Sequence, residues 1–173
     1  MKHRLMLLAG TGLLLGAFLW AVPGQAALPG AETCLIKGSA TITPGLKIAP
    51  QSGSVSISGS LSLCHGSNLK VAKGTVSASA SGTGSCAASE DHLSGTITWL
   101  KSSGVSLGTS TLSGTLVSTG PLANLAGTIT GGLFAGSPVT TTAEFQPAGG
   151  ATKATQCNSS TGLTNVTFEG VTT

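Results

Sequence analysis

Aromatic and charged residues are scarce in this chain, and tyrosine is absent: aromatic residues make up 3% of the sequence and charged residues 8%. Beyond residue 26, six scattered lysines stand against five acidic residues, so the charge is close to neutral. Proteins that bind nucleic acids present a patch or stripe of positive charge. The composition therefore gives no reason to expect a nucleic-acid partner.

Complete catalytic motifs are also missing. A Ser-His-Asp set could be imagined from His92, its neighbours Glu90 and Asp91 and one of many serines, but no Gly-x-Ser-x-Gly pentapeptide offers a serine on a strained turn. Glycoside hydrolysis would need paired carboxylates, and the few aromatic residues leave little to stack on a sugar ring. The carboxylates in question are Glu90, Asp91, Glu144 and Glu169. We predict no catalytic residue and expect that the protein is not an enzyme.

Metal and cofactor motifs are incomplete in the same way. Cys64 and His65 could act as copper ligands, but no methionine or nearby histidine completes the set. No C-x-x-C spacing is present, which argues against a zinc site or a redox-active pair. A glycine-rich phosphate loop leads into a helix, and no window beyond the first 26 residues shows sustained helical periodicity. We predict no metal and no cofactor.

The first 26 residues form a predicted signal peptide. Basic residues precede an apolar run from Leu5 to Val22, and the small residues Gly24 and Ala26 suit signal peptidase. An uncleaved anchor is the alternative, because the run is nearly long enough to cross a bilayer. We expect cleavage, which leaves a single domain at residues 27–173 that is secreted, extracellular and not inserted in a membrane.

All four cysteines lie in this exported part, where oxidising conditions make disulfides their usual state. If the strands run up and down in sequence order, Cys34 and Cys64 fall at one end of the fold, and Cys86 and Cys157 fall at the other. We therefore predict two structural disulfides and prefer the pairs Cys34–Cys64 and Cys86–Cys157.

Apolar and polar residues alternate along two stretches, Cys34 to Thr43 and Ser54 to Leu63, with a turn expected at Pro44-Gly45. A period of two is typical of half-buried β-strands. We expect a polar loop at residues 89–92 and a loop rich in proline and glycine around Cys157. Six further strands are expected at about 71–81, 93–100, 105–118 with a bend near Gly108, 122–134, 139–145 and 163–171.

The first disulfide conflicts with this alternation. Cys34 is in phase with the apolar residues of its strand, whereas Cys64 is in phase with the serines of its own. Two directly opposed cysteines must share a face of the sheet. A bulge at Gly38 or Gly59, or a strand that ends just before Cys64, would reconcile the pair.

About eight short strands separated by Gly, Pro and Ser turns predict an all-β protein, either an antiparallel β-sandwich or a small barrel. Many inward positions are small, and Trp99 is the expected largest core residue. A β-solenoid is the alternative, because Thr-Ile-Thr recurs at 41–43, 96–98 and 128–130, although without a fixed period. Such triplets could also template ice, but threonine is common on exposed strand faces.

A series of short motifs accompanies this pattern. They are Cys34, Thr43-Pro44-Gly45-Leu46, Cys64, Ser85-Cys86, Thr96 to Trp99, Gly132 to Gly136, Cys157 and Gly162-Leu163-Thr164. In this order the chain resembles small exported β-rich proteins with four cysteines that are common in actinobacteria and uncharacterised. The resemblance implies secretion and a disulfide-bonded β fold, and it implies no activity.

The features together favour a secreted, non-enzymatic protein that acts by surface contact or binding at the cell envelope or outside the cell. Its partner would be a protein or another component of the cell surface. A structural pilus- or coat-type subunit joined by strand exchange is the first alternative. A secreted hydrolase is the second.

Overall fold

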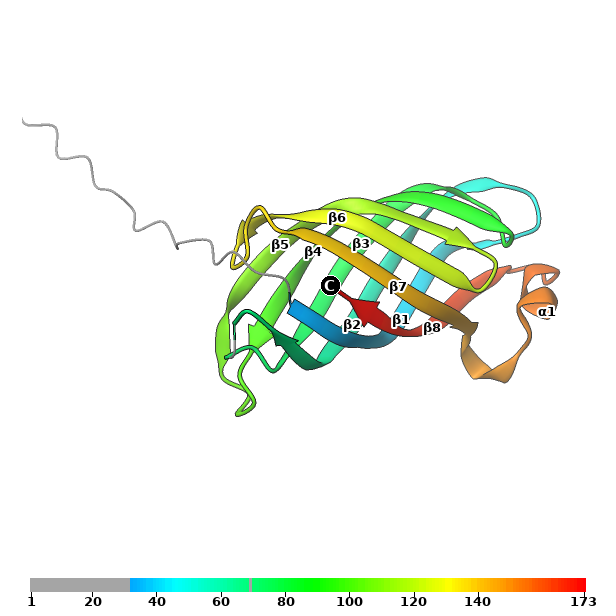
Figure 1. Ribbon diagram of the computed structural model, residues 1–173. Helices are drawn as coiled ribbons and strands as arrows, with labels where there is room; N and C mark the ends of the chain where they lie inside the picture. Colours follow the sequence, from blue (N-terminus) through cyan, green and yellow to red (C-terminus); the bar gives the residue numbers. More distant parts are fainter. Residues whose placement is uncertain (1–31, 69) are drawn as a thin grey trace, which may run out of the picture.

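The structure, a computed structural model, describes residues 32–68 and 70–173. The predicted signal peptide, residues 1–26, lies outside the described residues. Within them the chain forms eight antiparallel β-strands, with a short helix in the last loop (Figure 1). The elements are β1 (Glu32–Leu46), β2 (Gln51–Gly66), β3 (Lys73–Gly84), β4 (Ala88–Leu100), β5 (Ser106–Thr119), β6 (Leu122–Gly132), β7 (Pro138–Pro147), η1 (Ala148–Gly150), α1 (Lys153–Cys157) and β8 (Leu163–Thr172).

The sheet closes into a barrel, because each strand pairs with its neighbours in sequence and β1 also pairs with β8. Partners across this last seam run from Cys34 opposite Thr172 to Thr41 opposite Asn165, and the pairing resumes at Leu46 opposite Leu163. The expected all-β antiparallel fold with eight strands and two disulfides is confirmed. The sandwich and the solenoid are wrong, and the small barrel is right. A sandwich keeps edge strands in two sheets, whereas here the first and last strands satisfy each other's backbone groups.

Alternate side chains point into and out of the barrel along every strand. On β2 the serines from Ser54 to Ser62 are exposed, whereas the inner face of the barrel carries apolar side chains. Trp99 is 5% exposed and packs edge-to-face on Phe134, with ring centroids 5.1 Å apart. Trp99 is therefore the large core residue that the sequence predicted.

Paired glycines let the sheet curve and bring strands close to a large ring. Gly38 on β1 lies opposite both Gly59 on β2 and Phe168 on β8. A Cβ atom on Gly38 would lie only 2.7 Å from Cζ of Phe168. The Phe168 ring therefore occupies space inside the barrel that side chains at these positions would otherwise need.

The chain reverses after β1 at residues 47–50, and not at Pro44-Gly45 as predicted. β1 continues through Pro44 to Leu46. Its pairing with β8 is irregular between Thr41 and Leu46. Proline, which has no N–H to donate, is tolerated where a ladder is interrupted.

Of two further expectations about loops, the one at residues 89–92 is wrong, whereas the loop that carries Cys157 is present and contains a short helix. Residues 89–92 belong to β4, where they pair with residues 81–84 of β3. Cys157 ends the short helix α1, which Thr152 caps by accepting a hydrogen bond from the Thr155 backbone N–H. The predicted irregularity near Gly108 is present, since Trp99 faces Gly108 while Leu100 faces Ser106.

A bulge resolves the conflict at the first disulfide, but at Leu63 rather than at Gly38 or Gly59. Thr33 pairs with His65 and Leu35 pairs with Ser62, so β2 holds one extra residue there. Leu63 has a φ of 48° and is 72% exposed. Because the extra residue shifts the alternation by one position, Cys64 turns to the face of Cys34, to which it is bonded.

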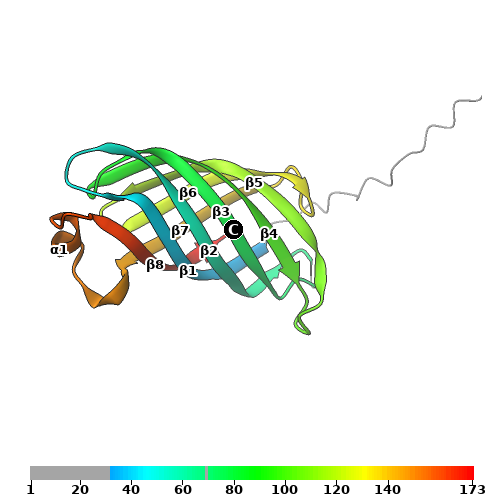
Figure 2. The ribbon, with the colours of Figure 1, turned by 180° about the vertical axis from the view of Figure 1, so that it is seen from behind.

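The two ends of the barrel differ. One end carries the short turns after β1, β3 and β5 together with α1, and the other carries the start of β1 and the end of β8 (Figures 1 and 2). Cys86 in the turn after β3 is bonded to Cys157 in α1. Both bonds join the pairs preferred from the sequence. Among the described residues, no helix is long and apolar enough to cross a membrane.

Candidate ligand-binding cavity in the barrel

The interior of the barrel contains three cavities of about 60 Å³ each. One lies at the end covered by α1, one lies in the middle, and one lies at the opposite end. The middle cavity shares Leu116 and Phe145 with the first, and Ile36 and Leu112 with the last. The three therefore follow one another along the barrel axis.

Small inward side chains create the middle cavity. Ala78 on β3, Ala123 on β6 and Ala143 on β7 line it and are all at least nine-tenths buried. Larger side chains such as Leu93 and Phe168 complete the wall without filling the space between the alanines. Because the wall is almost entirely apolar, this part of the interior suits an uncharged, apolar group.

The cavity beside α1 contains two ionisable groups. Asp91 on β4 is 6% exposed, and burial raises the pKa of its carboxyl, an effect that a hydrogen bond with Ser89 partly opposes. Lys153 in α1 lines the same cavity, and burial lowers the pKa of its ammonium group. The Lys153 Nζ donates a hydrogen bond to the carbonyl of Gly120 in the turn after β5.

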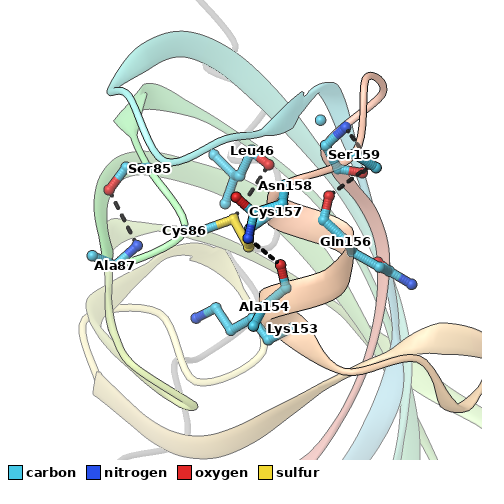
Figure 3. The surroundings of a disulfide bond; sticks show 12 residues. Leu46, Ser85, Cys86, Ala87, Lys153, Ala154, Gln156, Cys157, Asn158 and Ser159 are labelled. Atoms are coloured by element: carbon cyan, nitrogen blue, oxygen red, sulfur yellow. Dashed lines mark hydrogen bonds between the residues drawn. A yellow bond between two sulfur atoms is a disulfide. The ribbon is translucent and has the colours of Figure 1, made fainter.

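A disulfide bond crosses this end of the barrel. Figure 3 shows the Cys86–Cys157 bond between the turn after β3 and the helix that precedes β8. In the circular strand order these two loops lie on opposite sides of the barrel opening. The Cys86 backbone N–H also donates to the carbonyl of Lys47. The bond and its neighbours therefore hold α1 over the opening.

The cavity at the opposite end combines aromatic walls with a buried carboxyl group. Trp99 and Phe134 form part of the wall, and the Trp99 Nε1 donates to the Ser110 hydroxyl over 2.8 Å. Glu32, at the start of β1, lines the same cavity and is 6% exposed. Its Oε1 accepts the backbone N–H of Asn68 at 2.7 Å, and its Oε2 is buried without a hydrogen-bond partner.

The residues weighed as catalytic candidates do not come together. The pleat of β4 places Asp91 inside the barrel and its neighbours Glu90 and His92 on the exposed outer face. Glu144 lies opposite Glu169 on the outside of β7 and β8, where Lys37 forms an ion pair with Glu169 at 3.5 Å. Residues 32–68 and 70–173 hold no group of three or more His, Cys, Asp or Glu side chains placed to bind a metal ion.

Sequence reasoning weighed Asp91 but missed its inward position, and it did not single out Glu32 or Lys153. The signal for Asp91 was present, because it is in phase with Leu93, Ile97 and Trp99, which all face inward. Glu32 stands two residues before Cys34 and is likewise in phase with the inward residues of β1. Nothing in the local pattern marks Lys153, whose position depends on α1 and on the Cys86–Cys157 bond.

Comparison with known proteins adds no assignment to this geometry: no protein family model, no curated protein and no solved structure matches the chain. The class that the fold and cavities define is a closed eight-stranded antiparallel barrel with an apolar interior. The resemblance to exported actinobacterial proteins stays a prediction.

Proposed function

We propose that this protein is an exported, non-enzymatic binding protein that holds a small, mainly apolar ligand inside its barrel. The row of three cavities, which are mainly apolar and carry ionisable groups only toward the two ends, carries the proposal. An eight-stranded barrel is just wide enough for its side chains to fill or to hold one small ligand. Here small residues leave part of that width open.

The free-energy cost of unfilled cavities favours the binding of a ligand. An unfilled apolar cavity costs about 24 cal/mol per Å³, which is about 1.4 kcal/mol for a cavity of about 60 Å³. Each cavity is smaller than the ~150 Å³ of an apolar cavity known to bind benzene, so a ligand of that size must reach into more than one of them. A slender ligand that reaches along the axis would recover contacts in more than one cavity, so we expect an elongated molecule rather than a broad one.

Other features support export and a role in contact with water. The two disulfides are typical of proteins outside the cytosol, and the predicted signal peptide supplies a route. The outer face carries mainly serine and threonine, whose hydroxyl groups bind water. The closed strand order also favours a binding protein over a pilus- or coat-type subunit, because strand exchange needs an open sheet edge.

The isoleucines provide a direct test of the binding site. Methyl NMR of the protein titrated with 1-hexanol should shift the signals of Ile36, Ile57 and Ile129, which line the middle and far cavities. Ile48 is 66% exposed and outside the cavities, so its signal should stay in place. Shifts at Ile48 alone, or none at all, would contradict the proposal.

A matched pair of variants on β6 separates cavity binding from surface binding. Ala123→Leu places a larger side chain in the middle cavity and should weaken hexanol binding at least about tenfold, because the space is then occupied. Ala126→Leu makes the same change on the exposed outer face of the strand and should leave the affinity unchanged. Equal effects of the two variants would place the probe outside the barrel.

A further inference from the structure

We infer that the ligand carries an amine at one end, held by the Glu32 carboxyl group in the cavity opposite α1. This inference rests on the proposed function and adds the chemical class of the ligand. The starting observation is the Glu32 Oε2 atom, which is buried and has no hydrogen-bond partner. Burying a polar atom without a partner is costly, and burying a charged one costs more.

The residues that the structure describes, 32–68 and 70–173, donate no hydrogen bond to this oxygen. Oε1 already accepts the Asn68 backbone N–H. Two hydroxyl donors of the cavity wall are used elsewhere, since Thr141 donates to the Thr172 hydroxyl and Thr172 donates to the carbonyl of Thr140. Ser137 also lines the wall, but it makes no hydrogen bond to Oε2. The vacant acceptor therefore needs a donor that comes with the ligand.

The charge of the surroundings favours an ammonium group over a hydroxyl group as that donor. In the part of the chain that the structure describes, the single ion pair joins Lys37 to Glu169 on the outer surface. Glu32 therefore has no cationic partner there. A carboxylate in a mainly apolar cavity gains most from a group that supplies both a hydrogen bond and a positive charge.

The walls of the cavity indicate the chemistry of the rest of the ligand. Ile97, Ile129 and the edge-to-face pair of Trp99 and Phe134 surround the space beside Glu32. The next cavity, in the middle of the barrel, shares Ile36 and Leu112 with this one and has an apolar wall. A linear alkyl amine fits these walls, with its ammonium group at Glu32 and its alkyl part along the barrel axis.

Asp91 at the other end is a weaker candidate for the same role. Its carboxyl group has a hydrogen bond with Ser89, and Lys153 already brings an ammonium group to that cavity. An amine would meet a like charge there. The two ends of the barrel are therefore unequal, because among the described residues no Lys or Arg side chain lines the cavity at Glu32.

Three six-carbon probes test the inference with the same methyl signals. Hexylamine should bind about tenfold or more tightly than 1-hexanol or hexanoate, since a charge-assisted hydrogen bond forms with Glu32 only for the amine. Ile97 and Ile129 should report it, while Ile42, which lines the cavity beside α1, should respond less. A stronger response at Ile42 would place the amine at Asp91 and overturn the inference.

Glu32→Gln provides the decisive variant, because it keeps the shape and the acceptor for Asn68 but removes the charge. It should abolish the preference for hexylamine and leave hexanol binding intact. Hexanol binding by the variant also shows that the barrel is folded. If hexanol binds and hexylamine has no advantage in the unchanged protein, the inference is wrong and the proposed function stands. If no probe binds, both are wrong.

Discussion

Asp91 is the residue whose behaviour should depend most visibly on pH. It sits on the inner face of β4, and burial raises the pKa of its carboxyl above the ordinary 3.8. The folded state then holds the proton more tightly than the unfolded state does. Stability due to this group is therefore highest at low pH and falls as the pH rises from 3.8 through the folded pKa.

Asp91→Asn should remove this dependence. The variant should be more stable than the unchanged protein at about pH 7, and its advantage should shrink toward about pH 3, where the aspartate is protonated in both states. Thermal unfolding of both proteins across this pH range measures the difference. Glu90→Gln on the exposed face of the same strand is the control and should give no such trend. An advantage of Asp91→Asn that is the same at all pH values would contradict the assignment.

Gly38 should tolerate no side chain, because an added Cβ would collide with the Ser58 carbonyl oxygen and the Gly59 Cα of β2 as well as with the Phe168 ring. Gly38→Ala should lower the free energy of unfolding by about 1–3 kcal/mol, the range found for overpacked cores. Gly53→Ala is the control: its added Cβ would meet nothing closer than the Thr43 carbonyl oxygen at 3.2 Å. That variant should change stability by less than about 1 kcal/mol. Denaturant unfolding compares the two, and equal losses would argue against the close packing around Gly38.

At the scale of elements, the β7–β8 loop is the part whose position depends on a single covalent bond. The Cys86–Cys157 bond spans 71 residues of sequence and holds α1 over one opening of the barrel. Replacing both cysteines by serine should lower the free energy of unfolding by about 2–4 kcal/mol. It should also speed the exchange of bound hexanol, because α1 is then tied only by non-covalent contacts.

Exchange NMR of the bound probe measures this second effect. The matched variant replaces Cys34 and Cys64, whose bond joins the adjacent strands β1 and β2 at the other end. It should lose stability without a comparable gain in exchange rate. Faster exchange in the Cys34/Cys64 variant than in the Cys86/Cys157 variant would show that the probe passes through the opposite end.

The strands were the most predictable elements. The alternation of apolar and polar residues located all eight and identified most inward positions, because a period of two follows directly from the pleat. Local turn signals were less reliable. Pro44-Gly45 lies within β1 because its ladder with β8 is interrupted there, and the polar residues 89–92 extend β4 because β3 offers them partners.

At the scale of the whole molecule, closure and the cavities could not be predicted from local patterns. Closure depends on the register between β1 and β8, which are separated by more than a hundred residues. An inward alanine such as Ala123 indicates a small side chain but not whether a neighbour fills the space beside it. The same limit applies to Glu32, whose inward position follows from the alternation while its vacant acceptor follows from the positions of Thr141 and Thr172.

The seam between β1 and β8 has a consequence for how the chain can be connected. Because every strand pairs with the next and the last pairs with the first, the hydrogen-bonded order is a circle, and no strand is structurally first. Cys34 and Thr172 face each other across this seam. A short peptide could link the first strand to the last, and the chain could be opened instead in the exposed turn at residues 101–105, with each strand keeping both of its neighbours. The order of the strands along the chain could therefore be changed while their neighbours in the barrel stay the same.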